Sequence, residues 1–514
     1  MYANDRSGSG SNRWRQRHCV VVVALLSLVT IITTLQFYYS ITLRASIKDD
    51  KLSSLSISIP LRLSNYSKIN DTTTAADTSD GTVIATTSTT TNDKSSKEAS
   101  KGFGACLMIK EDNDLLYEWI AYHYVTLPLR YLVVGSDLNN QQNPYDVLSL
   151  WDDDNNDNDK KNLGLKYWII NATNDFMYRH DKSGNSVKDD KKKNNTTAND
   201  AHHAFVNRQR GFITTCTELL KREVPAINWV VYIDSDEYIV MNHLYENDTS
   251  DANNNDDERT NQQQQALELR KQLPYPSKDN FQYPTIIDAI KKLNFTSTSS
   301  THPKYNFTSC ITMPRLLHGS LLLPQNKTCS SSTTASESNA SSALEIAIEN
   351  GFLNNNNNNI HIASNGNHRE ISTLLYHQHA KKDDFSMSKY SKVMIDISRI
   401  PDEVLSTKVP RNIHRPYLPF CGPAVIPFDE SIFYINHYIG SWERYNSRID
   451  NRRSYNEWSI RALSQNANFE TRSCKQQNFI NKWFIEFIKQ VSKCNGNDND
   501  NGLQHAKYLF GIQN

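Results

Sequence analysis

Residues 228–239 read NWVVYIDSDEYI, an apolar run that ends abruptly in acidic residues. Continuous rather than alternating hydrophobicity is typical of a strand buried on both faces, as in a parallel sheet. The run therefore predicts a strand over Trp229–Ile233. In an open α/β sheet, ligands bind beyond the carboxyl ends of the strands. The acidic residues Asp234, Asp236 and Glu237 directly follow this strand, so they are the first candidates for a functional site.

The segments on either side alternate between strand and helix patterns. Short apolar runs predict further strands over 105–109, 130–134 and 165–170, and apolar residues at helical spacing predict helices over 114–125 and 203–222. Such alternation predicts an α/β fold, with a mostly parallel sheet flanked by helices and right-handed crossovers. We expect one large domain over residues 102–494.

The D-x-D pattern alone carries little information in this chain. It also occurs inside polar tracts, at Asp152/Asp154, Asp157/Asp159 and Asp498/Asp500. Of these matches, Asp234 is the one that follows a predicted strand. Carboxylates at a strand end can hold a hard divalent cation, which in turn binds a diphosphate through its oxygens. The alternative is an acidic strand end that faces solvent.

The N-terminus has the pattern of a membrane anchor. A basic segment over 1–18 precedes an uncharged, apolar stretch over 19–39, which is long enough to span a bilayer as a helix. The basic side stays cytosolic, which predicts a single-pass type II membrane protein. A cleaved signal peptide is the alternative, but the end of the apolar stretch lacks a small-residue cleavage site. Residues 40–101 are rich in Ser and Thr, which predicts a flexible stem.

Polar tracts interrupt the rest of the chain. We expect surface insertions at 152–162, 181–200, 246–279 and 329–368, and a C-terminal tail over 495–514. The chain carries 56 Lys and Arg against 56 Asp and Glu. This balance argues against nucleic acid as a partner.

The cysteine pattern favours disulfides. Of eight cysteines, all but Cys19 lie beyond the predicted anchor, and none forms a C-x-x-C pair, which makes zinc sites and thioredoxin-like redox motifs poor interpretations. In the oxidising lumen, cysteines can pair. We expect disulfides with one cysteine left over, and Cys474 with Cys494 is a candidate local pair. Sequons such as those at Asn65, Asn70 and Asn294 also suit the lumen.

Three blocks together resemble glycosyltransferase family 92 and the neighbouring family-2-like group. They are CLMIKEDNDLLYEWIAYHYVTLPLRYLVVGSD, NWVVYIDSDEYI and INHYIGSWERYNSR, and the match spans 106–448 with long gaps. The resemblance implies a GT-A fold, a nucleotide-sugar donor and a divalent cofactor of the Mn²⁺ type. It also implies an inverting, hexosyltransferase-type transfer to a hydroxyl of a glycan or glycoprotein. Together with the anchor and stem, it implies residence in the Golgi.

The resemblance carries over to the metal and donor sites position by position. Asp236 matches the metal-binding aspartate, and Asp234 matches the one that faces both ribose and metal. His437 matches the family's late histidine and is the candidate third metal ligand, although a core histidine is an equal alternative. Lys110 and Glu111 match the turn near the base and ribose, but an N-cap of the next helix explains them as well.

Further positions are candidates for contacts with the donor or the acceptor. Arg208 and Gln209 lie on the helix that leads to Asp234, and Arg208 could contact phosphate, although a solvated helical turn is as good an interpretation. Lys392 and His414 resemble residues that contact the diphosphate, and 313–315 and 318–320 resemble an acceptor-side loop. The second half of the chain also holds candidate general bases, Glu443 and Asp450, but no spacing singles out either.

Three alternative functions remain open from the sequence; the third, a membrane-tethered structural protein, is disfavoured by the alternation of buried strands and amphipathic helices. The first is a GT-A-like protein of the secretory pathway that has lost catalysis and binds glycans or serves as a scaffold; the Asp234/Asp236 pair argues against it. The second is a nucleotidyl- or phosphotransferase, although the sequence contains neither G-x-x-x-x-G-K-[ST] nor G-x-G-x-x-G.

Overall fold

The computed structural model describes residues 102–137, 140–151, 163–171, 198–244, 261–274, 283–293, 309–320, 343–356, 359–361, 370–381, 390–407, 413–414, 421, 426–447, 455–462, 469–472, 474–494 and 499–512. All of them belong to one compact unit, residues 79–514. The predicted tail, anchor and stem lie outside the described residues. Within the described part, no helix is both long and apolar enough to span a membrane.

The predicted strand that ends at the acidic turn lies inside a six-stranded sheet of the described residues, with the order β3-β2-β1-β4-β11-β6. Its strands are β1 (Phe103–Ile109), β2 (Leu129–Ser136), β3 (Lys166–Asn171), β4 (Trp229–Tyr232), β6 (Cys310–Met313) and β11 (Lys392–Asp396). The first four are mutually parallel, and β11 runs antiparallel to both β4 and β6. The predicted α/β class, with helices flanking a sheet that contains parallel strands, is confirmed.

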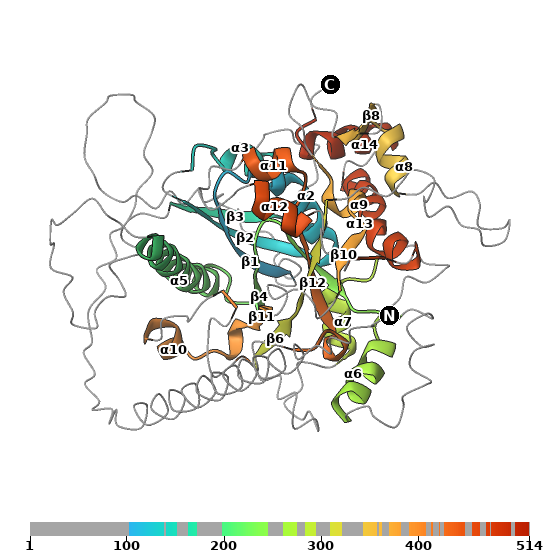
Figure 1. The fold of residues 1–514 in the computed structure, drawn as a ribbon. Helices are drawn as coiled ribbons and strands as arrows, with labels where there is room; N and C mark the ends of the chain where they lie inside the picture. The colour runs from blue at the N-terminus through green and yellow to red at the C-terminus, as the bar shows by residue number, and fades with distance from the viewer. Residues whose placement is uncertain are drawn as a thin grey trace, which may run out of the picture. The chain divides into compact units, whose positions relative to one another are not determined.

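Both faces of this sheet are buried, which explains the continuous apolar runs. Alternate residues of β1, β2 and β4 belong to two separate hydrophobic cores, one on each face. The helix α5 (Ala198–Glu223) lies on one face. Its Phe212 packs so closely on Gly135 of β2 that a Cβ atom added to Gly135 would lie 2.6 Å from the Phe212 ring. The helix α2 (Asn113–Thr126) lies on the other face (Figure 1). Both helices were predicted.

A second sheet of five described strands begins directly after the acidic turn. Its order is β13-β10-β7-β12-β5, with β5 (Glu237–Met241), β7 (Arg315–His318), β10 (Gln378–Ala380), β12 (Phe433–Tyr438) and β13 (Phe469–Thr471). The chain crosses between the sheets at residues 233–236, between β4 and β5, and again at Pro314, between β6 and β7. The acidic turn therefore lies where the two sheets meet.

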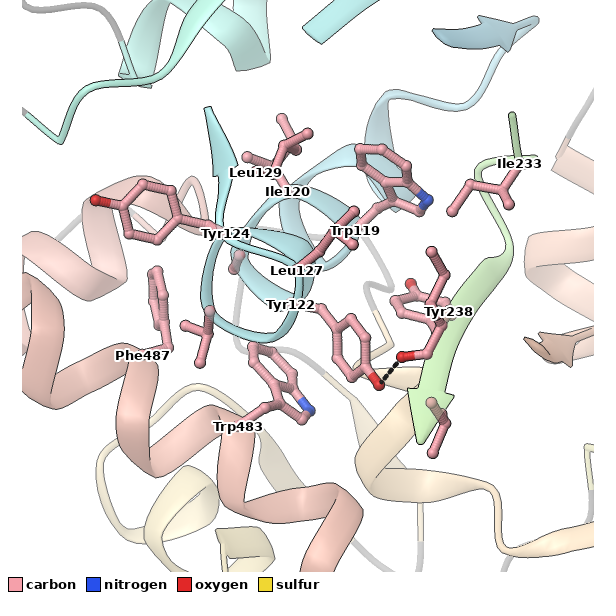
Figure 2. Close-up of a cluster of buried hydrophobic side chains, with 14 of the residues drawn as sticks. Trp119, Ile120, Tyr122, Tyr124, Leu127, Leu129, Ile233, Tyr238, Trp483 and Phe487 are labelled. Atoms are coloured by element: carbon pink, nitrogen blue, oxygen red, sulfur yellow. Dashed lines mark hydrogen bonds between the residues drawn. The ribbon is translucent and has the colours of Figure 1, made fainter. Parts of the chain in front are cut away.

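Side chains of α2 hold the acidic turn and the edge strand β5 in place. The Trp119 indole donates to the carbonyl of Asp234 at 3.2 Å, and the Tyr122 hydroxyl donates to the carbonyl of Ile239 at 2.8 Å (Figure 2). The amide of Ile239 donates to Nε2 of His123 at 3.4 Å. Polar backbone groups at a buried sheet edge need such partners, so α2 fixes the position of the turn.

Three helices lie within segments that were predicted to be polar insertions or a tail. The predicted insertion 246–279 contains α6 (Asn261–Lys271), whose Arg270 is buried and donates to the carbonyl of Asn242 at 2.8 Å. The predicted insertion 329–368 contains α8 (Ala343–Glu349), which packs against α13 (Cys474–Cys494). The C-terminal segment is not a tail, because α14 (Asn499–Leu509) also packs on α13 and Phe510 is fully buried. Helix α6 was hidden by its polar sequence, and α8, whose own sequence ALEIAIE is mostly apolar, was hidden by the polar tract around it.

The remaining described α-helices and strands are short, and β8 and β9 pair with each other as a separate two-stranded sheet. They are α3 (Tyr145–Leu148), α7 (Ile286–Lys292), β8 (Asn354–Asn356), β9 (Asn359–His361), α9 (Ser372–Leu375), α10 (Asp402–Thr407), α11 (Trp442–Ser447) and α12 (Tyr455–Ala462).

Two disulfides support the expectation of an oxidising compartment. Cys106 on β1 pairs with Cys216 on α5, and Cys310 on β6 pairs with Cys421. The candidate pair of Cys474 with Cys494 is wrong. These residues are the first and last of helix α13, so a rise of 1.5 Å per residue separates their Cα atoms by about 30 Å, which is far beyond the reach of a disulfide.

Candidate functional site

The acidic turn lies at the point where the strand order of the first sheet reverses. From β1 the chain adds β2 and β3 on one side and then returns to add β4 on the other side. The carboxyl ends of β1 and β4 therefore flank a topological switch point, which is where open α/β sheets bind ligands. The predicted segments 110–112 and 234–236 meet there, because the Ser235 hydroxyl donates to Asp112 Oδ2 at 2.7 Å.

The structure brings Asp236 and His437 together. Strand β12 pairs with β5, placing His437 opposite Glu237, and the amide of Tyr438 donates to the carbonyl of Asp236 at 2.9 Å. Nε2 of His437 lies 3.6 Å from Oδ1 of Asp236, and the two side chains are 12% and 17% exposed. Two residues far apart in the chain thus bring a nitrogen and an oxygen atom together on partly exposed side chains.

This pair fits a divalent cation. Two ligand atoms that each lie about 2.1 Å from one ion are at most about 4.2 Å apart, which accommodates the observed 3.6 Å. Imidazole together with carboxylate suits a transition metal such as Mn²⁺. In the part of the chain that the structure describes, no group of three or more His, Cys, Asp or Glu side chains is arranged to hold a metal. Phosphate oxygens and water would complete the coordination, as they do in many nucleotide sites.

Asp234, the other aspartate of the turn, faces a buried lysine. Nζ of Lys392 lies 2.6 Å from Asp234 Oδ2 and 3.1 Å from Glu237 Oε2. Glu237 is fully buried, accepts the amide N–H of Asp234 at 2.9 Å, and pairs with Arg315 at 3.2 Å. Burial alone would raise the pKa of Glu237, but the cations Lys392 and Arg315 outweigh it and hold that pKa below its ordinary value.

Glu237 has a structural role that the sequence reasoning missed, although the signal was present. A carboxylate at the start of the buried strand EYIVM needs a cation as partner. We expect Glu237→Gln to lower the free energy of unfolding by about 3 kcal/mol or more, because two buried cations lose their shared anion. Urea denaturation measures the change. The matched control is Glu223→Gln, because Glu223 pairs with Arg222 at the surface; this change should cost less than about 1 kcal/mol. Equal stability of both variants would contradict the role of Glu237.

The turn after β1 is hydrogen-bonded to the loop that follows β2. Glu111 has a positive φ of 55°, which is uncommon for a residue other than Gly. Its carboxylate accepts the amide of Gln141 at 2.5 Å, and its own amide donates to Asn140 Oδ1 at 2.9 Å. The N-cap residue of α2 is Asp112, whose side chain makes no capping bond. Glu111 therefore shapes the loop at the sheet edge, and the preceding Lys110 is half-buried beside it.

The candidates on α5 lie at the same edge of the sheet. Arg208 is half-buried and lies 3.5 Å from Asp137, which directly follows β2. A guanidinium held at the carboxyl ends of the strands can bind a phosphate oxygen. Gln209, on the same turn of the helix, is also half-buried.

The candidates for acceptor contacts are placed differently from the prediction. Met313 ends β6 and Arg315–His318 form β7, whereas Pro314, Gly319 and Ser320 lie outside the strands. His318 is fully buried, with Nε2 at 3.0 Å from Asn436 Oδ1. His414 contacts the carbonyl of Ser391 at 2.7 Å. Burial and the nearby Lys392 lower the pKa of His414 to about 4.

Of the two candidate bases, the structure describes one. Glu443 is exposed on α11. Asp450 lies outside the described residues.

Comparison with protein-family models, curated proteins and solved structures finds no match for this chain. The functional interpretation therefore depends on the geometry of the site and on the resemblance carried by the three sequence blocks.

Proposed function

We propose that this protein is a metal-dependent glycosyltransferase with a GT-A-type fold, which moves a sugar from a nucleotide-sugar donor to a hydroxyl of a glycan or glycoprotein. One observation carries the proposal: Asp236 in the acidic turn and His437 on β12, which are far apart in the chain, face each other at 3.6 Å beside the switch point. An acidic strand end that merely faced solvent would not need a histidine placed against it.

The surroundings of the pair suit a nucleotide diphosphate. The order β3-β2-β1-β4 is that of the first four strands of a dinucleotide-binding sheet, and it supports the GT-A expectation. Arg208, Asp137 and Glu111 lie at the same carboxyl edge. They offer a cation for phosphate and acceptors for hydroxyl groups of the nucleoside.

The reaction would be a displacement at the anomeric carbon. The acceptor oxygen forms a bond to this carbon, the bond between the carbon and the diphosphate oxygen breaks, and a general base takes the acceptor's proton. The chemistry that a divalent cation supplies, when held by Asp236 and His437, is neutralisation of charge on the leaving diphosphate. Inversion is the expected outcome, and the general base is not assigned.

The location of the protein is part of the proposal. The apolar stretch 19–39 would anchor the chain as a type II membrane protein, with residues beyond the stem in the Golgi lumen. The pairs Cys106–Cys216 and Cys310–Cys421 support an oxidising compartment.

Donor turnover by the purified full chain tests the function. A panel of UDP-, GDP- and CMP-sugars is incubated with Mn²⁺, with EDTA, and with EDTA followed by excess Mn²⁺, and release of the nucleotide is measured. We expect release from one donor class, lost with EDTA and restored by Mn²⁺. A folded chain that releases nothing from any donor and binds no nucleotide would refute the enzyme and leave the glycan-binding alternative.

A further inference from the structure

The side chain of Lys392 connects the protein interior to the candidate site. Only 1% of it is exposed, and its ammonium group lies between buried Glu237 and Asp234, whose side chain is 41% exposed. The shorter of the two contacts, 2.6 Å, is the one to Asp234. A buried cation with two anionic partners is held firmly, because leaving either partner would expose an uncompensated charge.

Buried contacts also hold Glu237, the inner partner of Lys392, and the strand that carries Lys392. Glu237 is fixed by Arg315 at 3.2 Å and by the amide of Asp234 at 2.9 Å. On β11, Lys392 is paired with Met313 of β6. Neither the lysine nor its inner partner can turn away without breaking buried contacts.

The two aspartates of the turn therefore face different side chains. Asp236 faces His437, and Asp234 faces Lys392. A metal ion on the lysine-bound oxygen of Asp234 would lie at most about 4.7 Å from the ammonium, from a metal–oxygen distance of about 2.1 Å and the 2.6 Å contact. Two positive centres that close repel each other.

We propose that Lys392 is the resident counter-cation of Asp234 and keeps this carboxylate off the metal, so that the ion is held by Asp236 and His437. Lys392 is then a positioning residue and not a contact of the diphosphate. This inference rests on the proposed function, because it assigns the ligands of the metal that the function requires.

Binding of Mn²⁺ alone to the full chain, without nucleotide, tests the assignment by isothermal titration calorimetry. Asp236→Asn should weaken binding by at least about 10-fold, since it removes a ligand. Asp234→Asn is the matched control at the same turn. It should change the affinity by less than about 3-fold, because Lys392 already neutralises this carboxylate.

Lys392→Gln gives the second measurement. Release of Asp234 should tighten Mn²⁺ binding, whereas a lysine that only contacts diphosphate, or only supports the fold, would leave Mn²⁺ affinity unchanged. If this variant does not fold, Asp234→Asn decides alone. Equal losses of Mn²⁺ affinity in Asp234→Asn and Asp236→Asn would overturn the inference and leave the proposed function standing. No Mn²⁺ binding by the unaltered chain instead refutes the metal-dependent function, and the inference with it.

Discussion

Turnover of the donor is expected to fall by at least about 100-fold when Asp236 is replaced by Asn or His437 by Ala. Each change removes one of the two side chains that face each other at 3.6 Å. With few protein ligands, the loss of one leaves the ion held mainly by substrate, and charge on the leaving diphosphate is no longer neutralised at a fixed position. The measurement is kcat/KM for the donor at saturating Mn²⁺.

A control with the same chemistry is available in the chain. Asp498→Asn/Asp500→Asn alters another D-x-D match, one that does not follow a strand, and it should keep full activity. The double variant Asp236→Asn/His437→Ala should be little worse than either single variant, because the two residues act as a unit. Full activity in His437→Ala would show that His437 is a core histidine and not a ligand.

Acidification from pH 7.5 to pH 5 is expected to destabilise the fold by at least about 2 kcal/mol. Burial lowers the pKa of His123 and of His243 to about 3, with Arg270 adding to the effect at His243, and lowers that of His377 to about 4. Burial also holds the pKa of His318 well below its ordinary value. These histidines are neutral in the folded chain.

The sign follows from proton uptake. Below pH 6.5 the unfolded chain binds protons at these histidines, whereas the folded chain does so only near pH 4 or lower, so stability is full above pH 6.5 and falls as the pH decreases toward 4. Each such histidine costs about 2 kcal/mol at pH 5. Burial raises the pKa of Glu118 and of Asp396, which act in the opposite direction. They are fewer than the histidines, so a net loss is expected.

Urea denaturation of the full chain at both pH values measures the change. His377→Gln should reduce the pH dependence by about 2 kcal/mol, because its amide can still donate to the carbonyl of Leu374, which His377 Nε2 contacts at 2.8 Å, but cannot titrate. Equal stability at pH 7.5 and pH 5 would contradict neutral burial of these histidines.

The elements around the acidic turn were predictable because their signals are local. The strands β1 to β4 are short apolar runs, the helices α2 and α5 carry apolar residues at helical spacing, and these residues fill the two cores. The helices that were not predicted lack such a local signal. Helix α6 is polar over most of its surface, and α14 follows a run of Asn and Asp, so a local pattern could not show that both pack against the fold.

The site was predictable in part for the same reason. Asp234 and Asp236 were found because they end a buried strand. The burial of Glu237 and of Lys392 was not foreseen, since each acquires its partners from other strands. His318 was expected at the acceptor side, but its strand places it inside the second sheet, against Asn436.

By itself the sequence determined the α/β class, the strand that carries the acidic turn and the candidate ligands on it. Only the tertiary structure decided which side chain each carboxylate faces: Lys392 for Asp234 and His437 for Asp236. The physical reason is that these contacts join residues that are distant along the chain, 158 positions apart for the lysine pair. They depend on strand order and register, and no local period of apolar residues encodes either.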